Sequence, residues 1–272
     1  MNDVLSDFSQ PSLVSAVKTS LYDVLRSLAS SRTAELSEKP EAVRWRTQVP
    51  HPWFNGLLSR QPPGKNAHRL VEDTIAYFRS HKVTSFTWWL EPHLTTAEWL
   101  MVLQRHGFQL DANVPGMAID LTRLSQTIPQ PRHFTIQVVD SLEMLKTWAH
   151  IFLKGYGLPE TWMDPYYDIV SNLGVDLPIR NYLGFLDGSP VSTSTLFLAA
   201  GAAGIYNVST LEEARGQGLG AAITWLPLRQ AQEMGYRVGV LQSSKMGFQV
   251  YKRLGFEVVC QMEHFYWSET SP

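Results

Sequence analysis

A glycine-rich hexapeptide, Arg215-Gly216-Gln217-Gly218-Leu219-Gly220, is the segment of this chain best suited to chemistry. Glycine has no Cβ, so such a segment turns tightly and brings its backbone N–H groups close to a ligand. An apolar strand is predicted to end at Val208 before it and a helix to begin after it, which adds the positive end of a helix dipole. Arg215 adds a cationic side chain. The pattern predicts a phosphate or pyrophosphate site; a tight turn without a ligand is the alternative.

Two common nucleotide sites do not match this hexapeptide. A phosphate-binding loop for ATP needs Gly-Lys-Ser/Thr, and the dinucleotide fingerprint needs a parallel strand–helix–strand unit with an acidic residue further on. The sequence has neither. ATP and NAD are therefore disfavoured.

A second block follows at residues 244–256, where Tyr251 stands shortly before Gly255 and Phe256. With both blocks in this order, the sequence resembles the GNAT superfamily of acetyl-CoA-dependent N-acetyltransferases. The hallmark of that superfamily, Q/R-x-x-G-x-G/A, is filled here by Arg215, Gly218 and Gly220. The resemblance covers residues 133–267.

The resemblance implies a role for each block. The loop amides would hold the pyrophosphate of acetyl-CoA, and exposed backbone groups of Tyr206, Asn207 and Val208, on a strand that splays from its neighbour, would pair with the pantetheine arm. Tyr251 would be the general acid for the leaving thiolate, for which a phenol with a pKa near 10 is suited. Ser244 stands where many members have Asn, so a CoA contact there is weaker or made by the hydroxyl. A core or surface tyrosine on an amphipathic helix is the alternative for Tyr251.

No general base is evident. Glu212 and Glu213 precede the glycine-rich segment and could reach an amine through water, but acids ahead of a helix often serve its dipole alone. His264 stands beside three aromatic residues, where a lone histidine is more often packed than catalytic. Glu212 is kept as a candidate.

The acceptor is expected to bind at residues 155–167. Tyr156 and Trp162 would line an aromatic pocket, with Asp164 available for an ammonium group; the alternative is that these aromatic residues cover the core. The predicted function is transfer of an acetyl group to a primary amine of a small molecule. The alternatives are a non-catalytic acyl-CoA-binding sensor or interaction module, and a protein or peptide N-acetyltransferase.

Composition narrows the class of protein. With 23 Lys+Arg against 25 Asp+Glu in 272 residues, the net charge of −2 gives no field for non-specific nucleic-acid binding. Cys260 is the only cysteine, which excludes an internal disulfide and a multi-cysteine zinc site. We expect no metal, no signal peptide, no membrane span and a cytoplasmic location.

A proline-containing polar stretch at residues 125–132 predicts a boundary between domains 1–126 and 133–272. The pattern V-x-x-R-x-G-F occurs in both halves, at residues 102–108 and 250–256. Each copy is typical of a helix end, so the first half resembles a degenerate copy without the glycine-rich segment, with Leu103 in the place of Tyr251. We predict an α+β (α/β layered) protein with tandem acetyltransferase-like folds, each a mixed, mostly antiparallel sheet flanked by helices.

Particular elements are also predicted. In the first half, a strand at 83–89 precedes a helix at 95–106. In the second, a capping box of Asp140 and Glu143 starts a helix that runs to residue 154, followed by a loop or short helix at 156–167. Strands are expected at 181–186, 191–199, 204–208 and 237–241, and a strand pair from 256. The helix after Gly218 contains Pro227, which is expected to kink it.

Overall fold

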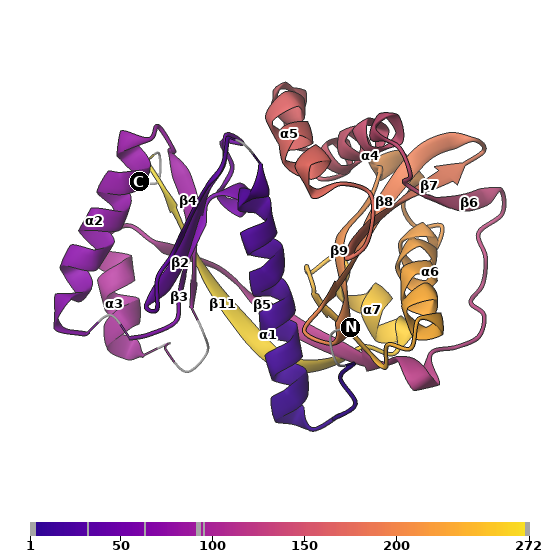
Figure 1. The fold of residues 1–272 in the computed structure, drawn as a ribbon, viewed down its shortest axis with the longest axis horizontal. Helices are drawn as coiled ribbons and strands as arrows, with labels where there is room; N and C mark the ends of the chain where they lie inside the picture. The colour runs from indigo at the N-terminus through magenta and orange to yellow at the C-terminus, as the bar shows by residue number, and fades with distance from the viewer. Residues whose placement is uncertain (1–3, 32, 63, 91–93, 95, 270–272) are drawn as a thin grey trace. The chain divides into compact units, whose positions relative to one another are not determined.

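The computed structural model describes residues 4–31, 33–62, 64–90, 94 and 96–269 (Figure 1). Its chain forms two compact units. Unit 1 combines Met1–Val24 with Pro115–Cys260, and unit 2 combines Leu25–Val114 with Gln261–Pro272.

Unit 1 contains the predicted site. Its elements in chain order are α1 (Gln10–Ser27, which ends in unit 2), β5 (Gln109–Asp120, which begins in unit 2), η5 (Leu121–Arg123), β6 (Phe134–Val138), α4 (Leu142–Gly155), η6 (Glu160–Trp162), α5 (Met163–Leu173), β7 (Ile179–Leu186), β8 (Ser189–Ala199), β9 (Ala202–Thr210), η7 (Glu212–Ala214), α6 (Leu219–Glu233), β10 (Val238–Gln242), α7 (Phe248–Leu254) and β11 (Glu257–Ser268, which ends in unit 2). The strand order within the unit is β5-β10-β9-β8-β7-β6. Of these pairs, β9 with β10 is parallel and the others are antiparallel.

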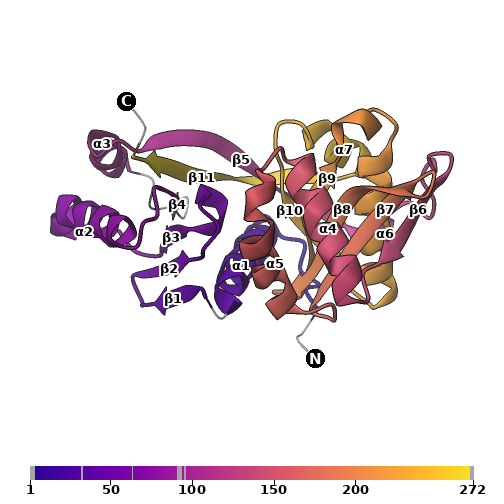
Figure 2. The same ribbon diagram turned by 90° about the horizontal axis from the view of Figure 1, so that it is seen from above.

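Unit 2 has an order of strands and helices similar to that of unit 1. Its further elements are η1 (Leu28–Ser30), β1 (Glu35–Glu38), β2 (Ala42–Arg46), η2 (Pro52–Phe54), β3 (Gly56–Ser59), η3 (Gly64–Asn66), α2 (Ala67–Ser80), β4 (Ser85–Leu90) and α3 (Ala97–Arg105). The strand order is β1-β2-β3-β4-β11, with β3 parallel to β4. Helices α2 and α3 share one hydrophobic core with β4, around Phe78, Trp88 and Trp99 (Figure 2). The predicted fold class, tandem units with mixed, mostly antiparallel sheets, is confirmed.

The two copies exchange their last strands. The strand that follows α3 is β5, and it pairs in unit 1 with β10. The strand that follows α7 is β11, and it pairs in unit 2 with β4. The compact units therefore do not coincide with the predicted domains 1–126 and 133–272, because a single boundary in the sequence cannot describe an exchange of strands. Helix α1 adds to the difference: Ala16 and Val17 pack against Val238 and Val240 of unit 1.

The repeated V-x-x-R-x-G-F pattern ends a helix in the same way in both units. The N–H of Phe108 donates to the carbonyl of Leu103 at 3.1 Å, and the N–H of Phe256 donates to that of Tyr251 at 3.0 Å. The glycine before each phenylalanine has a positive φ, 82° and 102°. These bonds form the same left-handed helix cap twice.

Two predicted details are corrected, and a third can be stated more closely. The N-cap of α4 is Ser141, whose hydroxyl accepts from the N–H of Met144 at 3.3 Å, and not Asp140. The stretch 156–167, expected as a loop or short helix, contains η6 and the first residues of α5, which begins at Met163. A single strand, β11, takes the place of the expected strand pair after Phe256. In the first half, the strand and the helix fall where expected, as β4 and α3.

The sheet of unit 1 has helices on both faces. Alternate side chains of a strand point to opposite faces. Ser194 of β8 bonds to the backbone of α6, whereas its neighbour Thr193 bonds to Ser209, whose side chain lies against Gly155 of α4. Helices α4 and α6 thus cover opposite faces of β8 and β9 (Figure 1). In the described part of the chain, no helix has the length and apolar character to cross a membrane.

Candidate acyl-CoA site

Strands β9 and β10 separate soon after they meet. They pair in parallel at Ala203 with Gly239 and at Gly204 with Val240. Beyond this point β9 runs on to Thr210 without β10 beside it, while β10 continues along β5. The backbone edge of β9 from Ile205 onward therefore faces an opening between two strands, and Tyr206, Asn207 and Val208 lie in this opened stretch.

A β-bulge at Asn207 shapes the opened part of β9. Asn207 has a φ of 53°, in the left-handed region that costs a non-glycine residue energy. The register between β8 and β9 shifts here, from Thr195 opposite Tyr206 to Thr193 opposite Ser209. A bulge of this kind turns backbone groups away from the ladder, and bulges are common beside active sites.

A ladder of buried polar side chains holds the bulge. The side-chain amide of Asn207 donates to Thr195 at 3.0 Å, and the Thr195 hydroxyl donates to the side-chain oxygen of Asn181 at 2.6 Å. The Thr193 hydroxyl donates to the Asn207 carbonyl at 2.8 Å. Our sequence reasoning missed Asn181, Thr193 and Thr195. The run Ser-Thr-Ser-Thr at 192–195, inside an otherwise apolar strand, is the signal that would have found the last two.

The glycine-rich segment forms an exposed turn at the N-terminus of α6. Gly216 and Gly218 have φ values of 79° and 84°, and Gly218 is the N-cap of the helix. No described residue accepts a hydrogen bond from the backbone N–H groups of residues 216–220. A Cβ added at Gly216 or Gly220 would meet nothing within 4 Å, so the space beside the turn is open. Free N–H groups, the helix dipole and open space together fit a phosphate group.

Arg215 has a structural task in addition to its charge. Its Nε donates to the carbonyl of Thr210 at 3.0 Å, and its Nη2 donates to the carbonyl of Gly155 at 2.9 Å. The side chain thereby ties the end of β9 to the end of α4. Arg215 was predicted as a cation for the anion site, and in this structure its guanidinium is turned at least partly toward the protein backbone.

Tyr251 of α7 is 8% exposed and lies in the main core of unit 1. None of the described residues forms a hydrogen bond with its hydroxyl. Burial, and after it the phenol of Tyr156, raises the pKa of Tyr251 above its ordinary value of 10. The hydroxyl is therefore a protonated donor at neutral pH. Ser244, which begins this block, accepts from the N–H of Gly247 at 3.1 Å and acts as a cap for the turn before α7.

The candidate bases differ in their surroundings. Glu212 is exposed in η7. Glu213 lies 3.6 Å from Lys154, and its own backbone N–H and this lysine lower its pKa. His264 belongs to unit 2, is 5% exposed and stacks on Trp89 with ring centroids 4.5 Å apart. His264 is therefore a packed residue, which is the alternative to a catalytic base.

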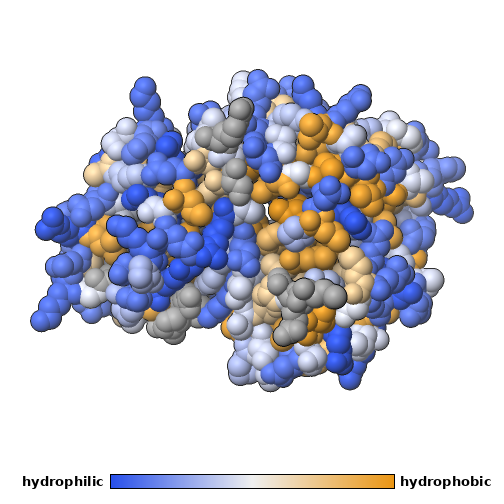
Figure 3. Space-filling view, viewed as in Figure 1, coloured by the Kyte–Doolittle hydropathy of each residue, from blue (hydrophilic) through white to orange (hydrophobic). Residues whose placement is uncertain are grey.

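The predicted acceptor residues divide into core and surface. Tyr166, which also lies in the segment 155–167, is buried and stacks on Phe152, so this aromatic residue belongs to the core. Asp164 is exposed in the first turn of α5, where it suits the helix dipole, and Trp162 is the N-cap of this helix. Tyr156 is 39% exposed. In the view of Figure 3, apolar groups reach the surface of unit 1, and the large apolar side chains that stay exposed in this unit include Leu142, Tyr156 and Met246.

Unit 2 lacks both features of the opened strand. Its parallel pair, β3 with β4, is joined along the whole of β3, from Gly56 opposite Thr87 to Ser59 opposite Leu90. The connection that follows β3, residues 60–66, contains one glycine, Gly64. The counterpart of Tyr251 is Leu103, which is fully buried. Among the described residues, unit 2 thus offers neither an open strand edge nor a glycine-rich turn.

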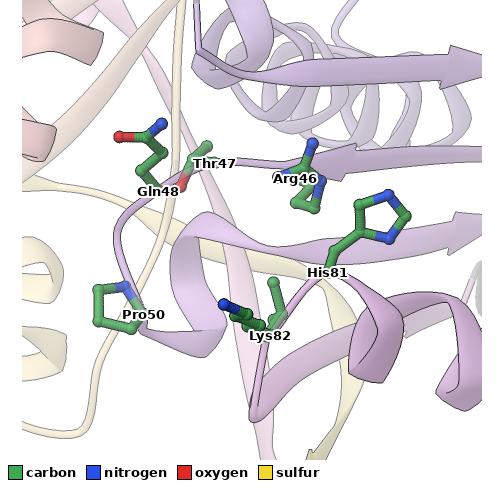
Figure 4. A pocket seen from close by; sticks show the side chains of 7 residues that line it. Arg46, Thr47, Gln48, Pro50, His81 and Lys82 are labelled. Atoms are coloured by element: carbon green, nitrogen blue, oxygen red, sulfur yellow. The ribbon is translucent and has the colours of Figure 1, made fainter.

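A surface cavity of about 310 Å³ lies in unit 2, lined by Arg46, Thr47, Gln48, Pro50, His81, Lys82 and Val83 (Figure 4). None of the predicted site residues is among them. Two of its basic groups have partners: Arg46 lies 3.1 Å from Glu35, and Nδ1 of His81 lies 2.8 Å from the carbonyl of Tyr77. Within the described chain, no cluster of His, Cys, Asp and Glu has the makings of a metal site.

Known proteins resemble this chain in structure. No family model matches the sequence, and no curated protein matches it. A GCN5-related N-acetyltransferase from Kribbella flavida is 20% identical with a TM-score of 0.67, covering 92% of this chain and 95% of its own. A GCN5-related N-acetyltransferase from Sphaerobacter thermophilus is 17% identical with a TM-score of 0.66, covering 91% and 85%.

A further structure has the same two-part organisation. It is a tandem GNAT protein from the clavulanic acid biosynthesis pathway, 12% identical with a TM-score of 0.56, covering 88% of this chain and 84% of its own. Each of these alignments spans both units of the chain described above. At this level of identity the similarity concerns the fold. The chain therefore has the fold of the GCN5-related N-acetyltransferases, in a tandem arrangement of two units.

Proposed function

We propose that this protein is an acetyl-CoA-dependent N-acetyltransferase that acts on a primary amine of a small molecule. The observation that carries the proposal is the N-terminus of α6, where the N–H groups of residues 216–220 have no acceptor among the described residues. This turn follows the opened strand β9 after the short helix η7. An anion at the turn and an extended arm along β9 would use backbone groups that the fold leaves open.

The residues of unit 1 supply the binding groups and one hydrogen-bond donor for the leaving sulfur. The turn at 216–220 would hold the pyrophosphate, and the opened edge around Asn207 would hold the arm. The amine nitrogen attacks the thioester carbonyl, the C–S bond breaks, and a net proton passes from the amine to the sulfur. Tyr251 donates a hydrogen bond to the sulfur as negative charge develops there.

The raised pKa of Tyr251 changes the role predicted for it. Complete proton transfer from a phenol with a pKa above 10 to a thiolate, whose pKa in cysteine is about 8.5, is unfavourable. Stabilisation of the developing thiolate by a hydrogen bond needs no such transfer. The group therefore serves as a protonated donor over the whole neutral range.

The test is the amine-dependent release of free CoA thiol from acetyl-CoA. A panel of simple amines, amino acids and aminoglycosides should contain acceptors that raise the release above hydrolysis. Binding of acetyl-CoA without release for any amine would contradict the enzyme and support a non-catalytic acyl-CoA-binding module instead. Two contacts favour that second function. Glu213 pairs with Lys154 and His264 stacks on Trp89, which leaves Glu212 as the remaining candidate base.

A further inference from the structure

The end of α4 is pressed against β9 at the opened edge. A Cβ on Gly155 would lie 2.7 Å from the hydroxyl oxygen of Ser209, so only glycine permits this approach. Arg215 then joins the carbonyls of Gly155 and Thr210. The two contacts fix the position at which the next residue, Tyr156, meets the strand.

Tyr156 is bonded to the opened strand itself. Its hydroxyl donates to the carbonyl oxygen of Val208 at 2.9 Å. Val208 lies beyond the last pair of β9 with β10 and at the register shift beside Asn207. It is also one of the three residues whose backbone groups are expected to pair with the arm of acyl-CoA. A side chain of the protein therefore uses an acceptor that the proposed ligand needs.

We infer that Tyr156 is a positioning residue that occupies the Val208 carbonyl and gives it up to the arm of acyl-CoA, so that the tyrosine sets the affinity for CoA. This inference rests on the proposed function. Release of the phenol would also free it on the acceptor side, where Tyr156 is already 39% exposed. Binding of acyl-CoA would then precede completion of the acceptor site.

Two further observations describe the phenol in its present position. Tyr156 makes a tilted ring contact with Phe152, at a centroid distance of 4.9 Å. Burial of its hydroxyl raises its pKa to about 12, so the phenol is a neutral donor where it now lies.

The experiment compares CoA binding by the wild type, Tyr156→Phe and the control Tyr167→Phe. Tyr167 makes a bond of the same kind, from its hydroxyl to the carbonyl of Leu142 at 3.1 Å, but not to β9. Removal of a competing hydrogen bond should tighten binding of CoA and acetyl-CoA to Tyr156→Phe by about 2- to 10-fold. The KM for acetyl-CoA should fall in step, and Tyr167→Phe should bind as the wild type does. Calorimetric titration measures each dissociation constant.

Unchanged or weaker binding by Tyr156→Phe, with wild-type binding intact, would overturn the competition and leave the proposed function standing. If neither the wild type nor any variant binds CoA, both the competition and the proposed function are overturned. Tyr156→Leu also lacks the hydroxyl donor and serves as a second variant if Tyr156→Phe folds poorly. Its affinity for CoA should change in the same direction. A purely structural tyrosine would weaken binding when removed, so the sign of the change decides.

Discussion

The Ser194 hydroxyl donates a hydrogen bond of 2.7 Å to the carbonyl oxygen of Ile223. That carbonyl lies four residues before Pro227, which has no N–H to offer it within α6. Ser194 and Ile223 are both fully buried, so without this bond the carbonyl would be an unsatisfied buried group. The sheet thus supplies the partner that the proline removes, next to Thr193 and Thr195, which hold the bulge.

We expect Ser194→Ala to lower the free energy of unfolding by about 1–3 kcal/mol, because it leaves the Ile223 carbonyl without a donor. In Pro227→Ala, the new N–H can bond to this carbonyl, so adding Ser194→Ala should cost less there than in the wild type. Urea denaturation of the two single variants and the double variant gives the coupling between them. If the changes in the free energy of unfolding of the two single variants add up to that of the double variant, Ser194 does not compensate for Pro227.

Gly216→Ala should weaken CoA binding, and a second glycine provides a matched control. Gly216 and Gly235 both have positive φ, 79° and 95°, and a Cβ on either meets nothing within 4 Å. Each alanine should therefore cost a similar ~1–2 kcal/mol of stability from backbone strain alone. Only Gly216 lies in the turn before α6. Calorimetry should show weaker CoA binding for Gly216→Ala, and an equal effect of Gly235→Ala would show that strain, not the turn, is responsible.

The sequence was sufficient to predict elements whose signals are local. Asp187 and Gly188 adopt φ values of 49° and 78° in the turn between β7 and β8, as a two-residue hairpin requires. The glycines of 216–220 and the repeated helix cap were predicted for the same reason, since backbone conformation depends on the residue that adopts it. Tyr251 was selected through the resemblance, which places a tyrosine shortly before such a cap, and its role stays a prediction.

Features that depend on distant partners escaped prediction. The exchange of β5 and β11 depends on pairing between residues more than 100 positions apart, such as Ile119 with Gly239. Two hydrogen bonds depend on how closely α4 approaches β9: Arg215 donates to the carbonyl of Gly155, and Tyr156 donates to the carbonyl of Val208. The compensation of Pro227 by Ser194 is of the same kind. The spacing of residues within one segment carries no information about contacts with distant segments.

Alkaline solution should destabilise the protein through Tyr182. Burial raises its pKa to about 12, while its hydroxyl donates to Gln230 at 2.6 Å. In the unfolded chain this tyrosine ionises near pH 10, so its contribution to stability is complete below pH 10 and is lost as the pH rises from 10 to 12. The loss amounts to about 2–3 kcal/mol. Urea unfolding at intervals of pH should show a smaller decline for Tyr182→Phe above pH 10, with a constant difference from the wild type at pH 7–9.

Tyr251→Phe should lower kcat by about 100-fold or more while the dissociation constant of CoA stays within twofold, because the hydroxyl would act on the leaving sulfur and not on the bound arm. The pH dependence gives a second check. The pKa of Tyr251 is raised above its ordinary value of 10, mainly by burial, so the phenol keeps its proton through pH 10 and its ionisation should cause no fall in kcat below that pH. Thiol-release rates measured from pH 7 to 10 test this. A fall in kcat between pH 7 and 10 that disappears in Tyr251→Phe would mean that the hydroxyl ionises at a lower pH than its burial allows. A kcat unchanged by the substitution would remove Tyr251 from the mechanism.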